Sequence, residues 1–156
     1  MIQVEIPGRG QLALAHLALD LNGTIALDGE LLPGVAERCH ALKAMLAVTL
    51  LTADTHGQAA ATAEALGVAL VRLTPGDEAA QKAAFVRQAG AERAVAIGNG
   101  ANDAAMLREA ALGIAVLGEE GLATEALQAA DVVVPGITAA LDLLRVPGRL
   151  RATLRR

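Results

Sequence analysis

The feature that most restricts the fold of this 156-residue chain is a series of short, continuous apolar segments, each followed by a segment of helical periodicity. The apolar segments cover residues 11–19, 47–51, 68–73, 94–97, 113–117 and 132–134. A strand with one solvated face would alternate apolar and polar residues, and these segments do not. Continuous apolar strands are typical of a parallel sheet that helices cover on both faces.

The intervening segments predict helices. Val35, Cys39, Leu42 and Leu46 recur at helical spacing after Pro33, which suits a first helical turn. Further helices are expected at 57–66, 77–88, 102–110 and 121–129, and from residue 137 onward. This alternation predicts one domain over residues 1–156, an α/β fold with a doubly wound, mainly parallel sheet. Residues 1–11 (IQVEI and the turn at 7–10) are expected to add an N-terminal hairpin strand.

Composition excludes several classes of function. With one phenylalanine, no tyrosine or tryptophan and a net charge of -4, the chain cannot offer a base-stacking platform or a basic phosphate-binding surface, so we expect no nucleic-acid partner. No apolar run reaches the roughly 18 residues of a membrane helix, and we expect no membrane partner. The N-terminus lacks the pattern of a secretion signal, which predicts a cytoplasmic location. The single cysteine excludes an internal disulfide.

The C-terminal segment 145–156 differs from the rest in charge. It holds five arginines and no acidic residue: Arg145, Arg149, Arg151, Arg155 and Arg156. One interpretation is a solvated basic helix or tail, with cations placed favourably near a helix C-terminus. The other is a docking surface for an acidic partner, a neighbouring subunit or an anionic substrate.

Polar residues gather directly after the predicted strands, where open parallel sheets bind their ligands. The first strand is followed by Asp20-Leu21-Asn22-Gly23-Thr24 and the second by Thr52-Ala53-Asp54-Thr55. The fourth is followed by Gly98-Asn99-Gly100-Ala101-Asn102-Asp103, and the helix after the third strand carries Lys82. Carboxylates, carboxamides, a hydroxyl and an ammonium are therefore expected around one crevice.

This set of groups suits phosphoryl transfer, in which positioning and charge neutralisation provide most of the catalysis. Asp20 can act as a nucleophile that forms an aspartyl-phosphate. Because the carboxylate and the phosphate repel one another, a Mg²⁺ ion is expected between them. It would be held by Asp20, a backbone carbonyl near Asn22, and Asn99 or Asp103. Thr52 could donate a hydrogen bond to a phosphoryl oxygen, and Lys82 would add positive charge.

In their order and spacing these segments resemble the four motifs of the haloacid dehalogenase-like hydrolases, over roughly residues 12–134. Residues 51–54, 98–107 and 112–116 resemble more closely the phosphorylation domain of P-type cation ATPases and the small soluble proteins similar to that domain. The resemblance implies a Rossmann-like core, with Asp20 as nucleophile, Thr52 as phosphate-binding hydroxyl, Lys82 as charge partner and Asp103 in the Mg²⁺ shell. Neighbouring positions are expected to contact the substrate: Gly23, Thr24, Ala53, Asp54 and Asn102.

Two positions depart from the family pattern. Asn22 stands where phosphatases of the family usually carry the acid that protonates the leaving group, and an amide cannot deliver that proton. Asn99 stands where the family usually has a Mg²⁺-binding Asp, which leaves a neutral carbonyl ligand. We therefore expect a slow phosphatase or phosphotransferase, or one that favours good leaving groups such as acyl phosphates.

The intervals between the motifs are too short for a cap domain. Residues 24–52 leave room for a short flap near 27–30 and one helix, and residues 52–82 for one helix and one strand. An uncapped crevice would accept a phosphorylated substrate as large as a macromolecule, or another subunit of a homo-oligomer would supply the lid.

Each of these residues also has a purely structural interpretation. Asp20 could cap a turn, Asp54 could cap the helix near Gly57, and Asn102 and Asp103 suit a helix N-terminus. His56 is expected at the mouth of the crevice. Since Asn22 and Asn99 both remove acids, the rival function is a non-catalytic phosphate-binding or regulatory module.

Overall fold

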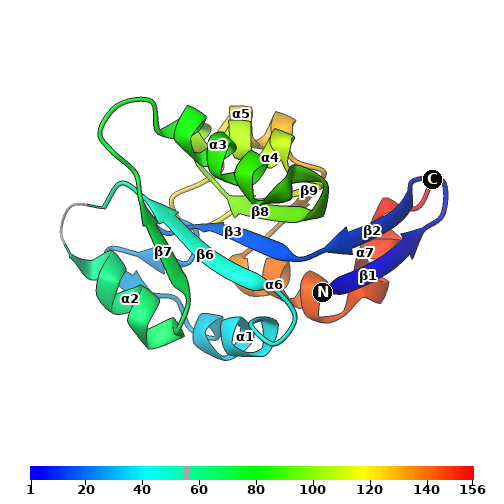
Figure 1. Ribbon diagram of the computed structural model, residues 1–156, viewed down its shortest axis with the longest axis horizontal. Coiled ribbons are helices and arrows are strands. Elements are labelled where there is room, and N and C mark those ends of the chain that lie inside the picture. The colour runs from blue at the N-terminus through cyan, green and yellow to red at the C-terminus, as the bar shows by residue number, and fades with distance from the viewer. Residues whose placement is uncertain (55–56) are drawn as a thin grey trace.

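A six-stranded sheet, wholly parallel, lies between two layers of helices in the computed structural model, which describes residues 1–54 and 57–156 (Figure 1). The strands follow the order β10-β9-β8-β3-β6-β7. Their bounds are β3 His16–Asp20, β6 Ala47–Thr52, β7 Ala69–Arg72, β8 Ala94–Gly98, β9 Leu112–Val116 and β10 Val132–Val134. The predicted doubly wound α/β fold is confirmed, and β3 occupies the centre, between β8 and β6.

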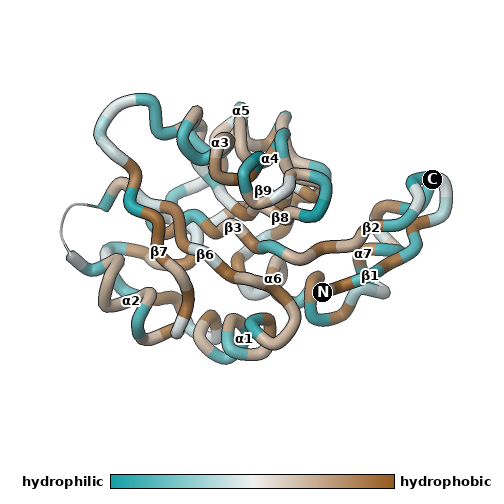
Figure 2. Tube along the Cα trace, viewed as in Figure 1, coloured by the Kyte–Doolittle hydropathy of each residue, from teal (hydrophilic) through white to brown (hydrophobic). Residues whose placement is uncertain are grey.

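Helices cover both faces of this sheet. On one face lie α3 (Glu78–Gly90), α4 (Ala104–Glu109) and α5 (Thr124–Ala129); on the other lie α1 (Val35–Leu42), α2 (Gln58–Leu66) and α6 (Ile137–Arg145) (Figure 1). Two short 3₁₀ turns, η1 (Ala91–Arg93) and η2 (Ala101–Asp103), flank β8. Figure 2 shows hydrophobic residues concentrated along the strands of the sheet. None of the helices in the described part of the chain combines the length and apolar character needed to cross a bilayer.

The prediction of a single strand over residues 11–19 is wrong. The chain forms β2 (Gly10–Leu14), antiparallel to β1 (Ile2–Ile6), and then β3 in the main sheet. The change of sheet occurs at Ala15, whose N–H donates to the carbonyl of Arg93 and whose carbonyl accepts from the N–H of Ala47. The hairpin predicted for residues 1–11 is therefore present and extends to Leu14.

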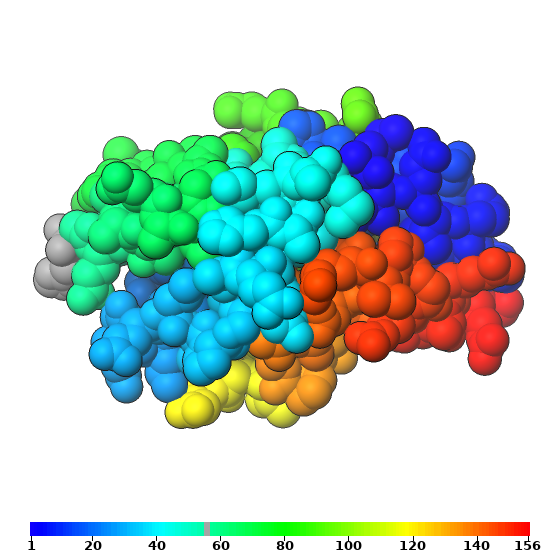
Figure 3. Space-filling view, turned by 90° about the horizontal axis from the view of Figure 1, so that it is seen from below, coloured from blue at the N-terminus to red at the C-terminus, as the bar shows by residue number. Residues whose placement is uncertain are grey.

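The chain ends in a second C-terminal helix, α7 (Pro147–Leu154), over the segment predicted to be a basic helix or tail. Pro147 begins it, because proline suits the first turn of a helix and cannot continue α6. α7 packs on β1, the Arg156 N–H donates to the Pro7 carbonyl, and the N-terminal and C-terminal segments of the chain lie side by side (Figure 3). This contact gives the two-stranded hairpin the apolar cover that an isolated hairpin lacks, with Leu150 buried.

A short flap follows β3 and replaces a cap domain. It consists of β4 (Ala26–Leu27) and β5 (Glu30–Leu31), joined at Asp28 and Gly29, which both have positive φ (50° and 84°). Two successive residues with positive φ are what a tight two-residue hairpin turn requires. As the described part of the chain has only α1 between this flap and β6, the expected absence of a cap is confirmed.

Candidate active site

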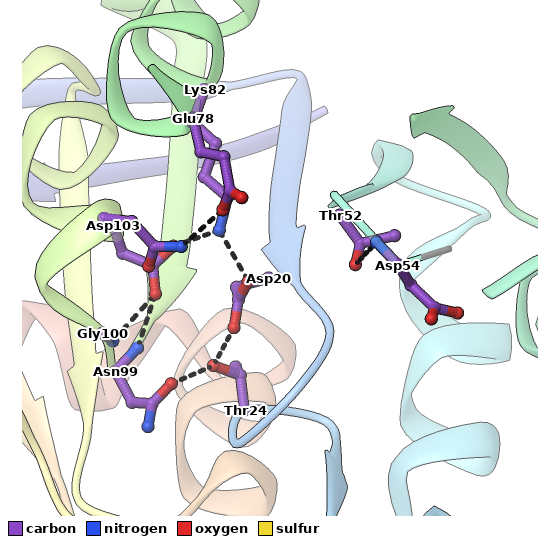
Figure 4. Close-up of polar contacts among 10 residues, drawn as sticks. Asp20, Thr24, Thr52, Asp54, Glu78, Lys82, Asn99, Gly100 and Asp103 are labelled. Atoms are coloured by element: carbon purple, nitrogen blue, oxygen red, sulfur yellow. Dashed lines mark hydrogen bonds and ion pairs between the residues drawn. The ribbon is translucent and has the colours of Figure 1, made fainter. Parts of the chain in front are cut away.

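Asp20 is the last residue of the central strand β3 and is 7% exposed. Its Oδ1 accepts a hydrogen bond from Lys82 Nζ at 2.7 Å, and its Oδ2 accepts one from Thr24 Oγ1 at 2.9 Å (Figure 4). Lys82 and Thr24 thus contact opposite oxygens of the carboxylate and hold it at the carboxyl edge of the sheet. Fixed positioning of a reacting group is one of the ways in which a site accelerates a reaction.

Lys82 belongs to α3 and is 1% exposed, although lysine is rarely buried without a partner. Its Nζ lies 2.7 Å from Asp20 Oδ1 and 2.7 Å from Asp103 Oδ1. Burial alone would lower the pKa of Lys82, but the two carboxylates outweigh it and raise that pKa above its ordinary value. The ammonium is therefore a permanent positive charge beside Asp20.

Burial is the main cause that raises the pKa of Asp20, and the charge of Asp103 adds to it. Lys82 and Thr24 act in the opposite direction, and the resulting pKa is about 6, compared with 3.8 for an exposed aspartate. An acid with such a pKa titrates close to neutral pH, so its reactivity responds to any cation placed nearby.

Asp103 lies in η2, directly after β8, and its side chain is fully buried. While Oδ1 accepts from Lys82, Oδ2 accepts from the backbone N–H groups of Asn99 (3.0 Å) and Gly100 (2.9 Å). These contacts fix both the loop after β8 and the position of Lys82. The expected Mg²⁺-shell role of Asp103 stays a prediction, because these contacts already engage both of its oxygens.

Thr24 joins Asp20 to Asn99 and is fully buried. Its Oγ1 lies 2.9 Å from Asp20 Oδ2 and 3.1 Å from Asn99 Oδ1 (Figure 4). A hydroxyl has one proton, so it can donate to only one of these two acceptor oxygens at a time. Thr24, which was expected to bind substrate, thus faces inward. The acceptor oxygen of Asp20 or Asn99 that does not receive its proton is available to a cation.

A cavity of about 450 Å³ opens at this edge of the sheet. It is lined by Asp20, Asn22, Thr52, Ala53, Asp54, Glu78, Lys82, Asn99, Gly100, Asn102 and Glu120. Lys82 is the only basic residue among these, whereas Asp20, Asp54, Glu78 and Glu120 are acidic. A phosphate dianion entering so acidic a cavity needs a further cation to offset the repulsion.

Thr52 and Asp54, at and just after the end of β6, lie on the other side of Asp20 from Asp103 and Asn99 (Figure 4). Thr52 is 3% exposed, and its Oγ1 accepts from the N–H of Asp54 at 3.1 Å, which leaves its hydroxyl proton for a ligand. Asp54 Oδ2 accepts from the N–H of Ala59 at 2.9 Å, so Asp54 caps the start of α2. His56, predicted at the mouth of the crevice, is outside the described residues.

Asn102 lines the cavity, and its Nδ2 donates to Glu78 Oε2 at 3.0 Å. Gly23, by contrast, lines a neighbouring cavity of about 360 Å³. The walls of that cavity are mostly apolar: Leu27, Leu32, Pro33, Val116, Leu117, Pro135 and Ile137. Of the expected site residues that the structure describes, Gly23, Thr24 and Asp103 are absent from the lining of the polar cavity.

Sequence reasoning missed Glu78, Gly100 and Glu120 as lining residues of the polar cavity. Glu78 lies one helical turn before Lys82, and this spacing puts both on the same face of α3. Glu120 follows β9, so the rule that ligands bind beyond strand ends also points to it. The apolar cavity joins residues from loops far apart in the sequence and gives no local signal.

The donor set suits Mg²⁺ better than a transition metal. No three His, Cys, Asp or Glu side chains in residues 1–54 and 57–156 are grouped to hold a metal ion. Mg²⁺ requires less, since it commonly takes one or two carboxylates and completes its shell with water and substrate phosphate. Asp20 Oδ2 and Asn99 Oδ1, which share one hydroxyl proton, are suitable oxygen donors for it.

The sequence matches the model of one protein family, described as haloacid dehalogenase-like hydrolase, over residues 3–111. The chain belongs to the haloacid dehalogenase-like hydrolases. The suspected family is confirmed. Residues of all four motif segments, among them Asp20, Thr52, Lys82 and Asn99, line the same polar cavity.

The chain has relatives by sequence, and one of them supports the resemblance to cation-transporting ATPases. A protein of Mycobacterium tuberculosis named probable cation-transporting ATPase G is 41% identical over 134 residues, which cover 83% of this hydrolase and 16% of the ATPase. The uncharacterized protein MJ0073 of Methanocaldococcus jannaschii is 47% identical over 64 residues, or 41% of this chain and 69% of that protein. The hydrolase therefore spans only a small part of the ATPase.

Solved structures share the fold at low sequence identity. The 3-deoxy-D-manno-octulosonate 8-phosphate phosphatase of Moraxella catarrhalis, solved with magnesium, phosphate and its sugar, has a TM-score of 0.69 at 16% identity, with 89% of this chain and 90% of that chain covered. The cobalt-bound form of the corresponding phosphatase from Haemophilus influenzae has a TM-score of 0.64 at 15% identity, covering 90% and 89%. Both are similar to this hydrolase in fold.

Proposed function

We propose that this hydrolase is a Mg²⁺-dependent phosphatase or phosphotransferase that acts through an aspartyl-phosphate on Asp20. The observation that carries the proposal is the fixed position of Asp20. Its carboxylate is held by Lys82 and Thr24 at the floor of a polar cavity, opposite the hydroxyl of Thr52. We propose that the protein acts in the cytoplasm.

In the first step, a carboxylate oxygen of Asp20 forms a bond to phosphorus. The bond between phosphorus and the leaving oxygen breaks, and its electron pair stays with the leaving group. Lys82 and the Thr52 hydroxyl stabilise the charge that develops on the phosphoryl oxygens. In the second step, water or another acceptor takes the phosphoryl group and restores the carboxylate.

The residues that would hold Mg²⁺ are Asp20, Asn99 and the backbone carbonyl of Asn22. When bound, the ion supplies positive charge that offsets the repulsion between carboxylate and phosphate. Asp103 acts on the reaction through Lys82, which it holds beside Asp20. Asn102 and Ala53 are the proposed contacts at the rim, where the substrate enters.

The decisive experiment is the formation of a phosphoryl mimic on Asp20. Incubation with beryllofluoride and Mg²⁺, followed by fluorine NMR, should give a bound signal that is absent from Asp20→Asn and from samples with EDTA. Turnover of acetyl phosphate should disappear in the same variant. If wild-type protein gives neither a bound signal nor turnover, the chain is the rival non-catalytic module.

A second prediction concerns the substrate preference that follows from Asn22. Because an amide cannot protonate the leaving oxygen, acyl phosphates should be hydrolysed faster than alkyl phosphate esters. Asn22→Asp should raise turnover of alkyl esters by roughly 10²-fold or more and change that of acetyl phosphate much less. Equal turnover of both classes by the wild-type protein would contradict this preference.

The open cavity supports two arrangements of the bound state. Because the described part of the chain has a short flap at residues 26–31 in place of a cap domain, a phosphorylated macromolecule could reach Asp20, or a second subunit could supply the lid. Light scattering with and without beryllofluoride and Mg²⁺ distinguishes them. A dimer or larger assembly would support the shared lid, whereas a monomer that dephosphorylates phosphoproteins would support the open site.

A further inference from the structure

Glu120 brings a carboxylate to the polar cavity from a position that no motif of the family includes. It lies in the loop between β9 and α5, in a four-residue turn closed by a hydrogen bond from the Gly121 N–H to the Gly118 carbonyl. A Cβ placed on Gly23 would lie 2.2 Å from Glu120 Oε2 and 2.9 Å from Asn99 Nδ2. The Glu120 carboxylate and the Asn99 amide therefore flank the same point, directly beyond Asn22.

Asn99 holds this loop in place through both its backbone and its side chain. The Asn99 carbonyl accepts from the Ala123 N–H at 2.9 Å, and Asn99 Nδ2 donates to the Gly121 carbonyl at 3.3 Å. Its Oδ1 is directed the other way, toward Thr24 and Asp20. An aspartate at position 99 would lose the bond to Gly121 and place a second carboxylate close to that of Glu120, so an amide suits this position better.

From this arrangement we infer that Glu120 supplies the carboxylate charge that Asn99 lacks, as an acceptor for water bound to the Mg²⁺ ion of the proposed site. We expect Glu120 to act through water rather than by direct coordination, because Asp20, Asn99 and the Asn22 carbonyl are the direct ligands of the proposed site. Mg²⁺ keeps several waters in protein sites, and the exposed Glu120 side chain can reach them from the cavity wall. The inference rests on the proposed function, since it concerns the cation of that site.

The first test measures Mg²⁺ affinity directly, by calorimetry and by Mn²⁺ electron paramagnetic resonance, without any substrate. Glu120→Gln should weaken binding roughly tenfold, the usual effect of removing an outer partner of a metal site. Glu119→Gln is the matched control: it removes the same charge from the same turn, but Glu119 lines the apolar cavity instead. Its affinity should stay within about twofold of wild type.

The second test asks whether positions 99 and 120 share one task. Asn99→Asp should improve Mg²⁺ affinity far more in the Glu120→Gln background than in the wild-type background, because only there does it replace a missing charge. Equal gains in both backgrounds would overturn the inference, as would an unchanged affinity of Glu120→Gln. If beryllofluoride still binds Asp20 in that case, the proposed function stands and only the role of Glu120 is wrong.

Discussion

The two faces of the central sheet are built from residues of very different size. Toward α1, α2 and α6 the strands present large side chains: Leu17, Leu19, Leu50, Val95, Ile97, Leu112 and Ile114. Toward α3, α4 and α5 they present mainly Ala18, Ala94, Ala96 and Ala115, with Leu51 as the large exception. Gly113 belongs to the small face too, since a Cβ there would lie 2.4 Å from the Leu107 carbonyl.

This difference explains how a helix residue reaches the nucleophile. Small side chains let α3 pack closely on β3 and β8, so the buried Lys82 reaches Asp20 and Asp103 from inside the helical layer. The opposite face buries large aliphatic side chains and contributes apolar burial instead. The face toward α1, α2 and α6, here called the aliphatic layer, therefore mainly stabilises the fold. The face toward α3, α4 and α5, here called the alanine layer, also positions the site.

The largest expected effect is that of Lys82→Met. Removal of the ammonium leaves Asp20 and Asp103 buried without their shared cation, which should destabilise the protein by about 3–5 kcal/mol in urea denaturation at neutral pH. The beryllofluoride signal should disappear as well. Lys43→Met is the control, because Lys43, the other lysine of the sequence, donates to the Leu66 carbonyl and does not line the polar cavity. Equal losses in the two variants would contradict a special role for Lys82.

The matched pair Leu17→Ala and Ala18→Leu separates the two layers. These neighbours on β3 are both buried and face opposite sides of the sheet. Leu17→Ala should cost about 2–5 kcal/mol through cavity formation, yet the folded protein should still bind Mg²⁺ and beryllofluoride normally. The measurement is urea denaturation together with Mg²⁺ calorimetry on the folded protein.

Ala18→Leu should cost less stability, about 1–3 kcal/mol, but disturb the site more. A larger side chain on the small face would push α3 outward and move Lys82 away from Asp20. We expect a weaker beryllofluoride signal in fluorine NMR even where circular dichroism shows a folded protein. If Leu17→Ala impairs the site as much as Ala18→Leu does, the division between the layers is wrong.

The parts of the fold and of the site that depend on short stretches of sequence could be predicted, and those that depend on distant contacts could not. The apolar segments predicted the strands of the sheet. The polar residues that directly follow these segments predicted most of the residues that line the polar cavity. The division of residues 11–19 into two strands at Ala15 was not predicted, because the apolar run is continuous there. The change of sheet depends on hydrogen bonds of Ala15 with Arg93 and Ala47, which are distant in the sequence. The inward orientation of Thr24 and Asp103 likewise depends on tertiary contacts that no local pattern contains.

A smaller effect concerns pH. Because the pKa of Asp20 is raised from 3.8 to about 6, this group favours the folded state most below pH 4, and the contribution is lost as pH rises through 6. The stability of wild type relative to Asp20→Asn, in EDTA, should therefore fall between pH 4 and pH 6. Mg²⁺ should shift this fall to lower pH, because a cation favours the ionised carboxylate. Urea denaturation across that pH range measures both, and a flat difference would contradict the raised pKa.

The smallest effect is expected in the aliphatic layer, at the ion pair between α1 and α6. Arg38 Nε and Nη2 each donate to Asp142 at 3.0 Å, and the Arg38 guanidinium lowers the pKa of Asp142. Stability from this pair is thus present above pH 4 and lost as pH falls through the lowered pKa. Arg38→Met should cause the smallest loss of the series, one that shrinks further in high salt because the pair is partly solvent-exposed. Thermal denaturation at low and high salt tests this. Mg²⁺ affinity should stay unchanged, since neither Arg38 nor Asp142 lines the polar cavity.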